Sequence, residues 1–274
     1  MKESARVLFV NSEIYPFLPE SDISVVGRYL PQGIQELGKE IRSFMPRYGC
    51  INERRNQLHE VIRLSGMNIV IDNIDRPLII KVSSISSARM QVYFIDNEDY
   101  FQRKMIFSNE DGNYFPDNDQ RAIFFTRGVL ETVKKLRWKP DIIHCQGWIS
   151  HLLPIYLKKA YIEDPVFSDS KIVLSLYNDC LDQTFSDNMI SKIILPGLSE
   201  NDLKIINSPN GINLAKLAIL NADAIIHGEE RLNKELSDFV VDSGLPQLPY
   251  QKIDYPENTF IKEYNRFYDQ ILEK

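Results

Sequence analysis

The chain has 274 residues, 43% of them hydrophobic and 11% aromatic, which is enough for one large core or two lobes. Its formal net charge of −6 at pH 7 argues against a protein that binds nucleic acid or an anionic membrane. No apolar run approaches the roughly 18 residues that span a bilayer, and the first residues lack a signal-peptide core, so we expect a cytoplasmic protein. The three cysteines form no CxxC pair, which predicts free thiols and no zinc site. We also expect no cofactor.

The first elements are predicted to be a strand, a helix and a strand. An apolar run at residues 6–11 is typical of a parallel strand that is buried on both faces. Apolar residues follow at helical spacing over residues 23–37, and Gly38 offers a C-cap. Residues 41–45 predict the next strand, which completes a β-α-β unit.

The following stretch differs in character. Short β-rich segments alternate with Gly66, Asn73 and Pro77, which favour turns. Together they predict an antiparallel excursion at one side of the main sheet. The segments are residues 59–64, 68–71, 78–82 and 91–95.

The rest of the chain returns to alternating helices and strands. We predict helices at residues 117–136, 149–159, 212–220 and 229–240, and strands at 141–145, 171–176 and 224–226. This order favours an α/β fold with a Rossmann-like, doubly wound parallel sheet. We assign residues 1–244 to one domain. Residues 245–274 are predicted to be a tether and an amphipathic helix, at residues 257–273, that packs on the same domain.

Five stretches between Arg6 and Leu236 match blocks of one enzyme family. They are VLFVNSEIYPF (residues 7–17), VYFIDNEDYFQR (92–103), YFPDNDQRAIFFTRGVLE (114–131), WKPDIIHCQGWISHLLPIYLK (138–158) and INLAKLAILNAD (212–223). In these stretches the chain resembles the N-terminal catalytic half of bacterial glycogen synthases and plant starch synthases. The resemblance implies the first lobe of a GT-B glycosyltransferase, which transfers glucose from ADP-glucose to an α-1,4-glucan without a metal.

The chain departs from that family at the donor side. At the first loop the family carries Lys-Thr-Gly-Gly-Leu-Ala-Asp, whose lysine and glycines meet the donor's phosphates and sugar. Here the loop reads Pro19-Glu20-Ser21-Asp22, which lacks the cation and adds two carboxylates. Ile149 stands at the last position of the family's His-Asp-Trp-His loop, and Tyr177 replaces a further histidine.

Two further differences follow from the same comparison. His227-Gly228-Glu229 stands where the family has Val-Ser-Pro, and no stretch resembles the second lobe. We therefore expect no catalytic residue, no metal site and no donor site in this chain. His144 is interpreted as a core histidine, and His151 as a packing or surface residue rather than a substitute for the lost histidine.

The acceptor side is better preserved. Aromatic, carboxylate and amide side chains that match family positions in or beside the cleft could still hold a glucan. These candidates are Tyr93, Asp96, Asn97, Tyr100, Asp117, Asn118, Arg121, Trp148 and Asn178. A purely structural role is the competing interpretation, because Asp117-Asn118 suits a helix N-cap and Tyr93 and Trp148 could be core aromatics.

Three hypotheses for function follow. The first is a non-catalytic domain that binds an α-glucan, a small metabolite or a protein partner through the acceptor cleft. The second is a glucosyltransferase completed by a separate partner chain that supplies the missing lobe. The third is a structural protein that forms homo-oligomers through its cleft face. In each case we expect no nucleic-acid or membrane partner.

Overall fold

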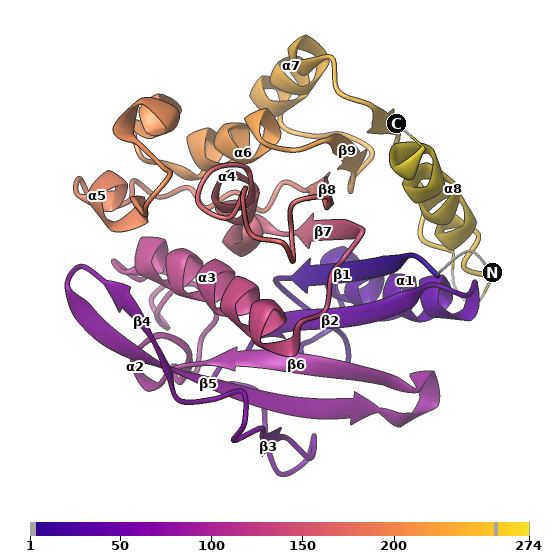
Figure 1. The fold of residues 1–274 in the computed structure, drawn as a ribbon, viewed down its shortest axis with the longest axis horizontal. Helices are drawn as coiled ribbons and strands as arrows, with labels where there is room; N and C mark the ends of the chain where they lie inside the picture. The colour runs from indigo at the N-terminus through magenta and orange to yellow at the C-terminus, as the bar shows by residue number, and fades with distance from the viewer. Residues whose placement is uncertain (1–3, 255–256, 274) are drawn as a thin grey trace.

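The computed structural model describes residues 4–254 and 257–273. A single mixed sheet forms its centre, with the strand order β10-β9-β8-β7-β1-β2-β6-β5-β3 and with β4 paired to β5 (Figure 1). Neighbouring strands from β10 to β6 are parallel, whereas β5 is antiparallel to β6, β3 and β4. The predicted α/β class with a mostly parallel sheet is therefore confirmed.

The elements have the following bounds. The strands are β1 (Arg6–Asn11), β2 (Glu40–Pro46), β3 (His59–Glu60), β4 (Met67–Ile71), β5 (Ile74–Ile85), β6 (Met90–Asp96), β7 (Ile142–Gln146), β8 (Lys171–Leu176), β9 (Ala224–His227) and β10 (Gln247–Leu248). The α-helices are α1 (Asp22–Glu36), α2 (Glu98–Phe101), α3 (Asn118–Leu136), α4 (Leu153–Lys158), α5 (Met189–Ile193), α6 (Gly211–Leu220), α7 (Lys234–Ser243) and α8 (Phe260–Leu272). Three 3₁₀ turns are η1 (Ser86–Ala88), η2 (Trp148–Ser150) and η3 (Glu200–Ile206).

Two predicted elements need correction. The segment at residues 91–95 does not belong to an antiparallel excursion alone, because β6 pairs in parallel with β2 and antiparallel with β5. The predicted helix at residues 149–159 is divided into η2 and α4. Pro154 lies in the first turn of α4 and has no N–H to bond the carbonyl of Ser150, so a continuous helix is interrupted there.

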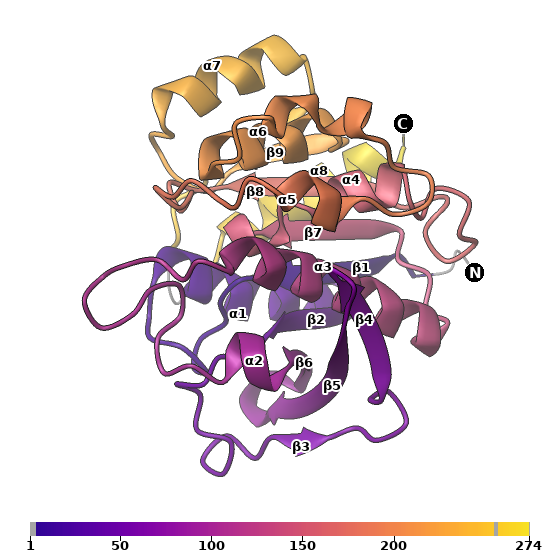
Figure 2. The same ribbon diagram turned by 90° about the vertical axis from the view of Figure 1, so that its left-hand side faces the viewer.

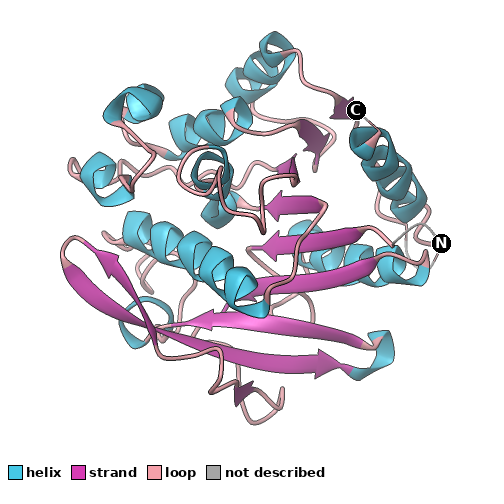
Figure 3. Ribbon diagram, in the orientation of Figure 1, coloured by secondary structure: helices cyan, strands magenta, loops and turns pink. Residues whose placement is uncertain are grey.

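Helices cover both faces of the sheet, as Figure 3 shows. Along β1, Val7 and Phe9 join one buried cluster with α1 and α8, while Leu8 and Val10 join the larger cluster on the opposite face. This alternation follows from the two-residue period of a strand. It explains why residues 7–10 of β1 are all apolar.

Helix α8 is fixed to the sheet by a buried polar contact. His144 in β7 is fully buried, and its Nδ1 lies 2.8 Å from the hydroxyl of Tyr268 while its Nε2 lies 2.6 Å from Ser175 Oγ. Burial lowers the pKa of His144 to about 3, so the ring is neutral at pH 7. The interpretation of His144 as a hydrogen-bonded core histidine is confirmed.

The carboxyl ends of the parallel strands share one edge of the sheet, which we call the carboxyl edge. This edge lies at the left of Figure 1, and Figure 2 looks directly at it. The loops that follow β1, β7 and β8 meet there. Within residues 4–254 and 257–273, no helix has both the length and the apolar character that a membrane crossing requires.

Candidate functional site

The candidate site lies where the connections leave the sheet in opposite directions. The chain runs from β1 through α1 to β2 on one face, and from β6 through α3 to β7 on the other. In open α/β sheets such a switch point leaves a crevice outside the carboxyl ends, where ligands usually bind. Here that position falls between β1 and β7, which are neighbours in the sheet.

Gly147 brings three loops into close contact. It follows β7 with a φ of +85°, and an added Cβ would lie 2.1 Å from Ser12 Oγ and 3.2 Å from Asp179 Oδ2. Asp179 Oδ2 in turn accepts a 2.7 Å hydrogen bond from the backbone N–H of Trp148. Only glycine fits this position, because both the backbone conformation and the space exclude a side chain.

Burial changes the acid–base properties of this cluster. The Asp179 carboxyl has its pKa raised to about 6, chiefly by burial, with smaller contributions from the charges of Glu13 and Glu229. Burial also raises the pKa of Glu13, although a 3.0 Å hydrogen bond from Ser21 Oγ opposes the shift. Carboxylates from three different loops therefore act on one another at the carboxyl edge.

Several buried polar atoms here have no hydrogen-bond partner among the described residues. They are Ser12 Oγ, Tyr48 Oη, Gln146 Oε1, Trp148 Nε1, Tyr177 Oη and Asp179 Oδ1. Buried polar groups in native proteins are usually paired, so these atoms need water molecules or polar ligand groups as partners. The set contains hydrogen-bond donors and acceptors. It therefore suits hydroxyl groups, each of which can donate and accept a hydrogen bond.

Arg121 is the buried cation beside this cluster. Its Nε donates to Tyr100 O at 2.8 Å and its Nη1 donates to Asn118 Oδ1 at 2.7 Å, while Nη2 has no partner among the described residues. The guanidinium lies 6.0 Å from the centre of the Tyr48 ring. Burial lowers the pKa of Arg121 to about 10, so the side chain stays charged at pH 7.

The structure brings most of the predicted acceptor residues to the carboxyl edge. Asp117 forms a two-pronged ion pair with Arg103, both contacts being 2.6 Å long. Trp148 is 1% exposed and its ring lies 5.6 Å from that of Phe107 and 6.5 Å from that of Phe185.

Three more candidates have structural partners at this edge. Asp96 is fully buried with Lys81 Nζ at 2.9 Å. Asn97 caps α2 by accepting from the backbone N–H groups of Asp99 and Tyr100. The Tyr100 hydroxyl donates to Gln120 Oε1 at 2.8 Å.

Asn178 joins the loops after β8 and β9. Its backbone N–H donates to Glu229 Oε1 at 2.7 Å, and its side-chain amide donates to Glu229 Oε2 and, at 2.8 Å, to Arg231 O.

Tyr93 lies apart from the other candidates. It is in the middle of β6, where its hydroxyl accepts a 2.9 Å hydrogen bond from Arg42, and it lines a pocket at the amino ends of the strands.

Two cavities of about 570 and 580 Å³ lie on either side of the loop after β8. The first is bounded by residues 112–116 and 182–186 and contains the partly exposed ring of Tyr114. The second is bounded by residues 180–184 and by the first residues of α6. Gln183 connects the loops, since it donates to Phe115 O and accepts from Asn118, both at 2.9 Å.

Residues that the sequence analysis did not single out also belong to the cluster. Ser12, Glu13, Tyr48 and Asp179 each follow a buried parallel strand within three residues of its end. A polar residue in that position is directed to the ligand edge of the sheet. That rule, applied to every predicted strand, would have identified all four.

The comparisons with known proteins agree with this architecture. The family described as the starch synthase catalytic domain matches residues 6–248. The chain belongs to this family. The predicted relationship is thereby confirmed, and the matched region extends beyond the Arg6–Leu236 stretch on which the resemblance was based.

Similar proteins are glycogen synthases of Chlorobium and Chlorobaculum species. The chain is 40% identical to the glycogen synthase of Chlorobium limicola over 178 residues, covering 65% of this chain and 36% of that protein. It is 34% identical to the glycogen synthase of Chlorobium luteolum, and that match covers 86% of this chain and 49% of that protein. It is 30% identical to the glycogen synthase of Chlorobaculum parvum, and that match covers 100% of this chain and 57% of that protein. The chain thus spans roughly a third to just over half of the length of these family members.

A solved structure confirms the fold. The catalytic domain of starch synthase IV from Arabidopsis thaliana, in a complex with ADP and acarbose, superposes with a TM-score of 0.71. The match covers 91% of this chain and 52% of that one at 18% sequence identity. At this identity the comparison concerns the arrangement of helices and strands.

Proposed function

We propose that this chain is a glucan-binding member of the starch synthase family that does not itself transfer glucose. The observation that carries the proposal is the chemistry of the carboxyl edge. Unpaired hydroxyl, amide, indole and carboxyl atoms gather there beside the carboxylates of Glu13 and Asp179. A sugar would bind in the two cavities at this edge, where these two carboxylates favour a neutral, hydroxyl-rich ligand over a diphosphate.

The first loop supports the same conclusion. Ser21 is the N-cap of α1, where its Oγ accepts from Ser24 N at 3.1 Å and its own N–H donates to Ser24 Oγ at 2.8 Å. A helix N-terminus binds phosphate through free N–H groups and positive charge. Here a capping box uses part of that capacity, Glu20 and Asp22 are exposed beside it, and residues 12–27 contain no lysine or arginine.

The loops after β8 and β9 both differ from the family, and the residues that differ fit against one another. Tyr177 is 1% exposed, and a Cβ at Gly228 would lie 2.5 Å from its ring. A tyrosine at 177 therefore requires glycine at 228. Together with the contacts between Asn178 and Glu229, this pairing supports an edge that was rebuilt as a unit rather than damaged at single positions.

Transfer of glucose is the second candidate function, and the names of the relatives favour it. The glycogen synthases that resemble this chain are longer, so additional sequence could supply a nucleotide-sugar site. A partner polypeptide carrying a second Rossmann-like lobe would have to rebuild that site against the Glu20–Asp22 loop. The two candidates differ in whether labelled glucose is incorporated.

One experiment separates these possibilities. The purified chain is incubated with glycogen and labelled ADP-glucose, and the glycogen is then sedimented. The proposal predicts that the protein sediments with glycogen while no label enters the polymer. Incorporation of label would overturn it in favour of a transferase, and protein that stays in solution would overturn it in favour of a structural role.

A further inference from the structure

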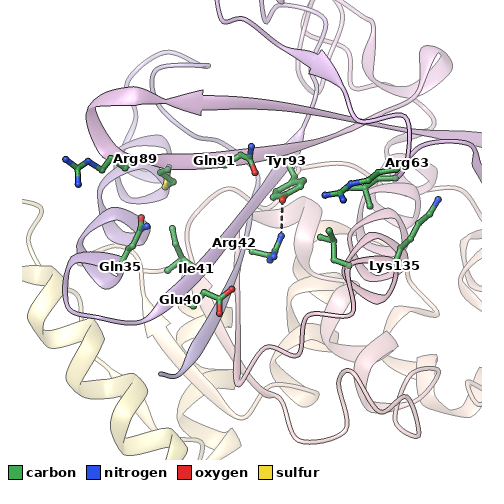
Figure 4. Close-up of a pocket in the computed structure, with 12 residues that line it drawn as sticks. Gln35, Glu40, Ile41, Arg42, Arg63, Arg89, Gln91, Tyr93 and Lys135 are labelled. Carbon is green, nitrogen blue, oxygen red and sulfur yellow. Dashed lines mark hydrogen bonds between the residues drawn. The ribbon is translucent and has the colours of Figure 1, made fainter. Parts of the chain in front are cut away.

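A second pocket lies at the opposite edge of the sheet, near the amino ends of β2 and β6. It has a volume of about 730 Å³, which is within the range of small-molecule sites. Figure 4 shows its lining residues, which come from the end of α1, from β2, from the turn after β3, from the start of β6 and from the end of α3. Nothing in the proposed glucan site uses these residues.

The pocket is rich in positive charge although the chain as a whole is acidic. Arg42, Arg63, Arg89 and Lys135 line it, and Glu40 is its single carboxylate. That carboxylate is engaged elsewhere, because Glu40 Oε1 accepts from Trp138 Nε1 at 2.6 Å and Oε2 lies 3.4 Å from Arg6 Nε. The cations of the pocket are therefore not neutralised by it.

The arginines have few partners of their own. Among the described residues, neither Arg63 nor Arg89 forms a side-chain hydrogen bond or an ion pair. Arg42 donates to Tyr93 and lies 5.1 Å over the Trp138 ring, but its buried Nε has no hydrogen-bond partner in the described part of the chain. Lys135 is in the last turn of α3 and also offsets the negative end of that helix, so the argument rests on the arginines.

Figure 4 shows how these side chains are arranged. Arg42 and Arg63 point toward the Tyr93 ring in the middle of the pocket, and Arg89 lies at the far end beyond Gln91. Arg89 has a φ of +50°, the left-handed region that disfavours side chains other than glycine. It is the residue that ends η1, as Arg137 is the left-handed residue that ends α3.

We propose that this pocket binds a small molecule that carries phosphate groups. Guanidinium groups match phosphate oxygens in geometry and charge, and two or three of them around one pocket form a recurrent phosphate site. Arg42 and Arg63 lie on either side of Tyr93, while Arg89 lies at the rim with its guanidinium directed away from Tyr93. Several cations around one pocket fit a ligand with more than one anionic group better than a single phosphate ion. A neutral glucan would leave these charges unpaired.

Inorganic pyrophosphate is the probe that tests the proposal. Calorimetric titration of the whole protein should give saturable binding that weakens as salt is raised. Arg63→Gln should bind at least about tenfold more weakly, since one charge-assisted contact is lost. Its urea midpoint should not change, because Arg63 is exposed and has no partner among the described residues.

A matched pair of glycine variants gives a second readout. Arg89→Gly removes a pocket cation and also relieves the left-handed backbone, so binding should weaken while the urea midpoint stays equal or rises. Arg137→Gly makes the same exchange at a φ of +52°, at an exposed residue that does not line the pocket. It should bind pyrophosphate almost as the wild type does. Absence of saturable binding, or equal affinity in all variants, would overturn the proposal.

Discussion

At the scale of single residues, Gly147 determines how closely the loops of the carboxyl edge approach one another. Its backbone lies against Ser12, and the next residue donates to Asp179. Two separate effects exclude a side chain here, the positive φ and the short distance to Ser12 Oγ. They can be measured separately because other glycines of the chain have a similar φ but no atom near an added Cβ.

We expect Gly147→Ala to destabilise the protein by about 3 kcal/mol or more, since left-handed backbone strain and a steric clash add. Gly112→Ala is the control, because Gly112 has a φ of +83° with no atom within 4 Å of its added Cβ. That variant should lose only about 1 kcal/mol. Urea unfolding of both proteins measures the difference, and equal losses would show that the contact with Ser12 is not tight.

The raised pKa of Asp179 predicts how the stability of the protein changes with pH. Its pKa is raised to about 6 in the folded protein, so between about pH 4 and pH 6 the folded state binds more protons than the unfolded state. Stability contributed by the neutral carboxyl is present below that range and is lost as the pH rises through it. The loss is at most about 3 kcal/mol, because one pKa unit corresponds to about 1.4 kcal/mol.

The variant Asp179→Asn isolates this effect, because its amide oxygen can still accept from the Trp148 N–H. Relative to wild type, the variant should gain stability between pH 4 and pH 7, as measured by urea unfolding at a series of pH values. Titrating groups that do not interact with Asp179 cancel in the difference. A difference that does not depend on pH would mean that Asp179 is solvated in the folded protein.

At the scale of elements, the contact between α8 and β7 shows how the C-terminal helix is attached. Tyr268→Phe removes the hydroxyl that bonds His144 Nδ1 and leaves that buried nitrogen without a partner. We expect a loss of about 1–3 kcal/mol in thermal or urea unfolding. Arg266→Ala on the same helix is the control, since its exposed ion pair with Glu263 should contribute less than about 0.5 kcal/mol.

The bounds of a helix or strand could be predicted where apolar runs and capping residues nearby in the sequence determine them. The apolar runs of β1 and β8 predicted their bounds residue for residue, and Gly38 marked the end of α1 within two residues. The predicted helix at residues 229–240 begins instead at Lys234. Glu229 is used in a contact with Asn178, and Asn233 is the N-cap. That boundary depends on a tertiary contact, which no local pattern contains.

Some residues of the site could be predicted from the sequence, whereas others are brought together only by the folded sheet. The family resemblance indicated Trp148, Arg121 and Asn178, all of which lie at the carboxyl edge. Tyr48 and Asp179 each follow a buried strand, which predicts their place at this edge, but their closeness to the other residues of the cluster depends on the order of strands in the sheet. Tyr93 illustrates the opposite case, because its position in the middle of β6 places it toward the basic pocket rather than the other candidates.

At the scale of the whole molecule, the two edges of the sheet have opposite chemistry. The carboxyl edge gathers carboxylates and unpaired polar atoms, whereas the amino edge carries a pocket lined by three arginines and a lysine. A protein with this charge distribution should bind neutral sugars and small anions at separate places. Binding of one should therefore leave the affinity for the other unchanged.

The most direct measurement is calorimetric titration of the protein with a malto-oligosaccharide. The account predicts saturable heat, weakened in Tyr114→Ala, whose partly exposed ring lines the cavity beside the loop after β8. Ile162→Ala, an exposed residue that lines none of the cavities described above, should leave the affinity unchanged. No heat at millimolar sugar, or equal affinity in the two variants and the wild type, would contradict a glucan site at the carboxyl edge.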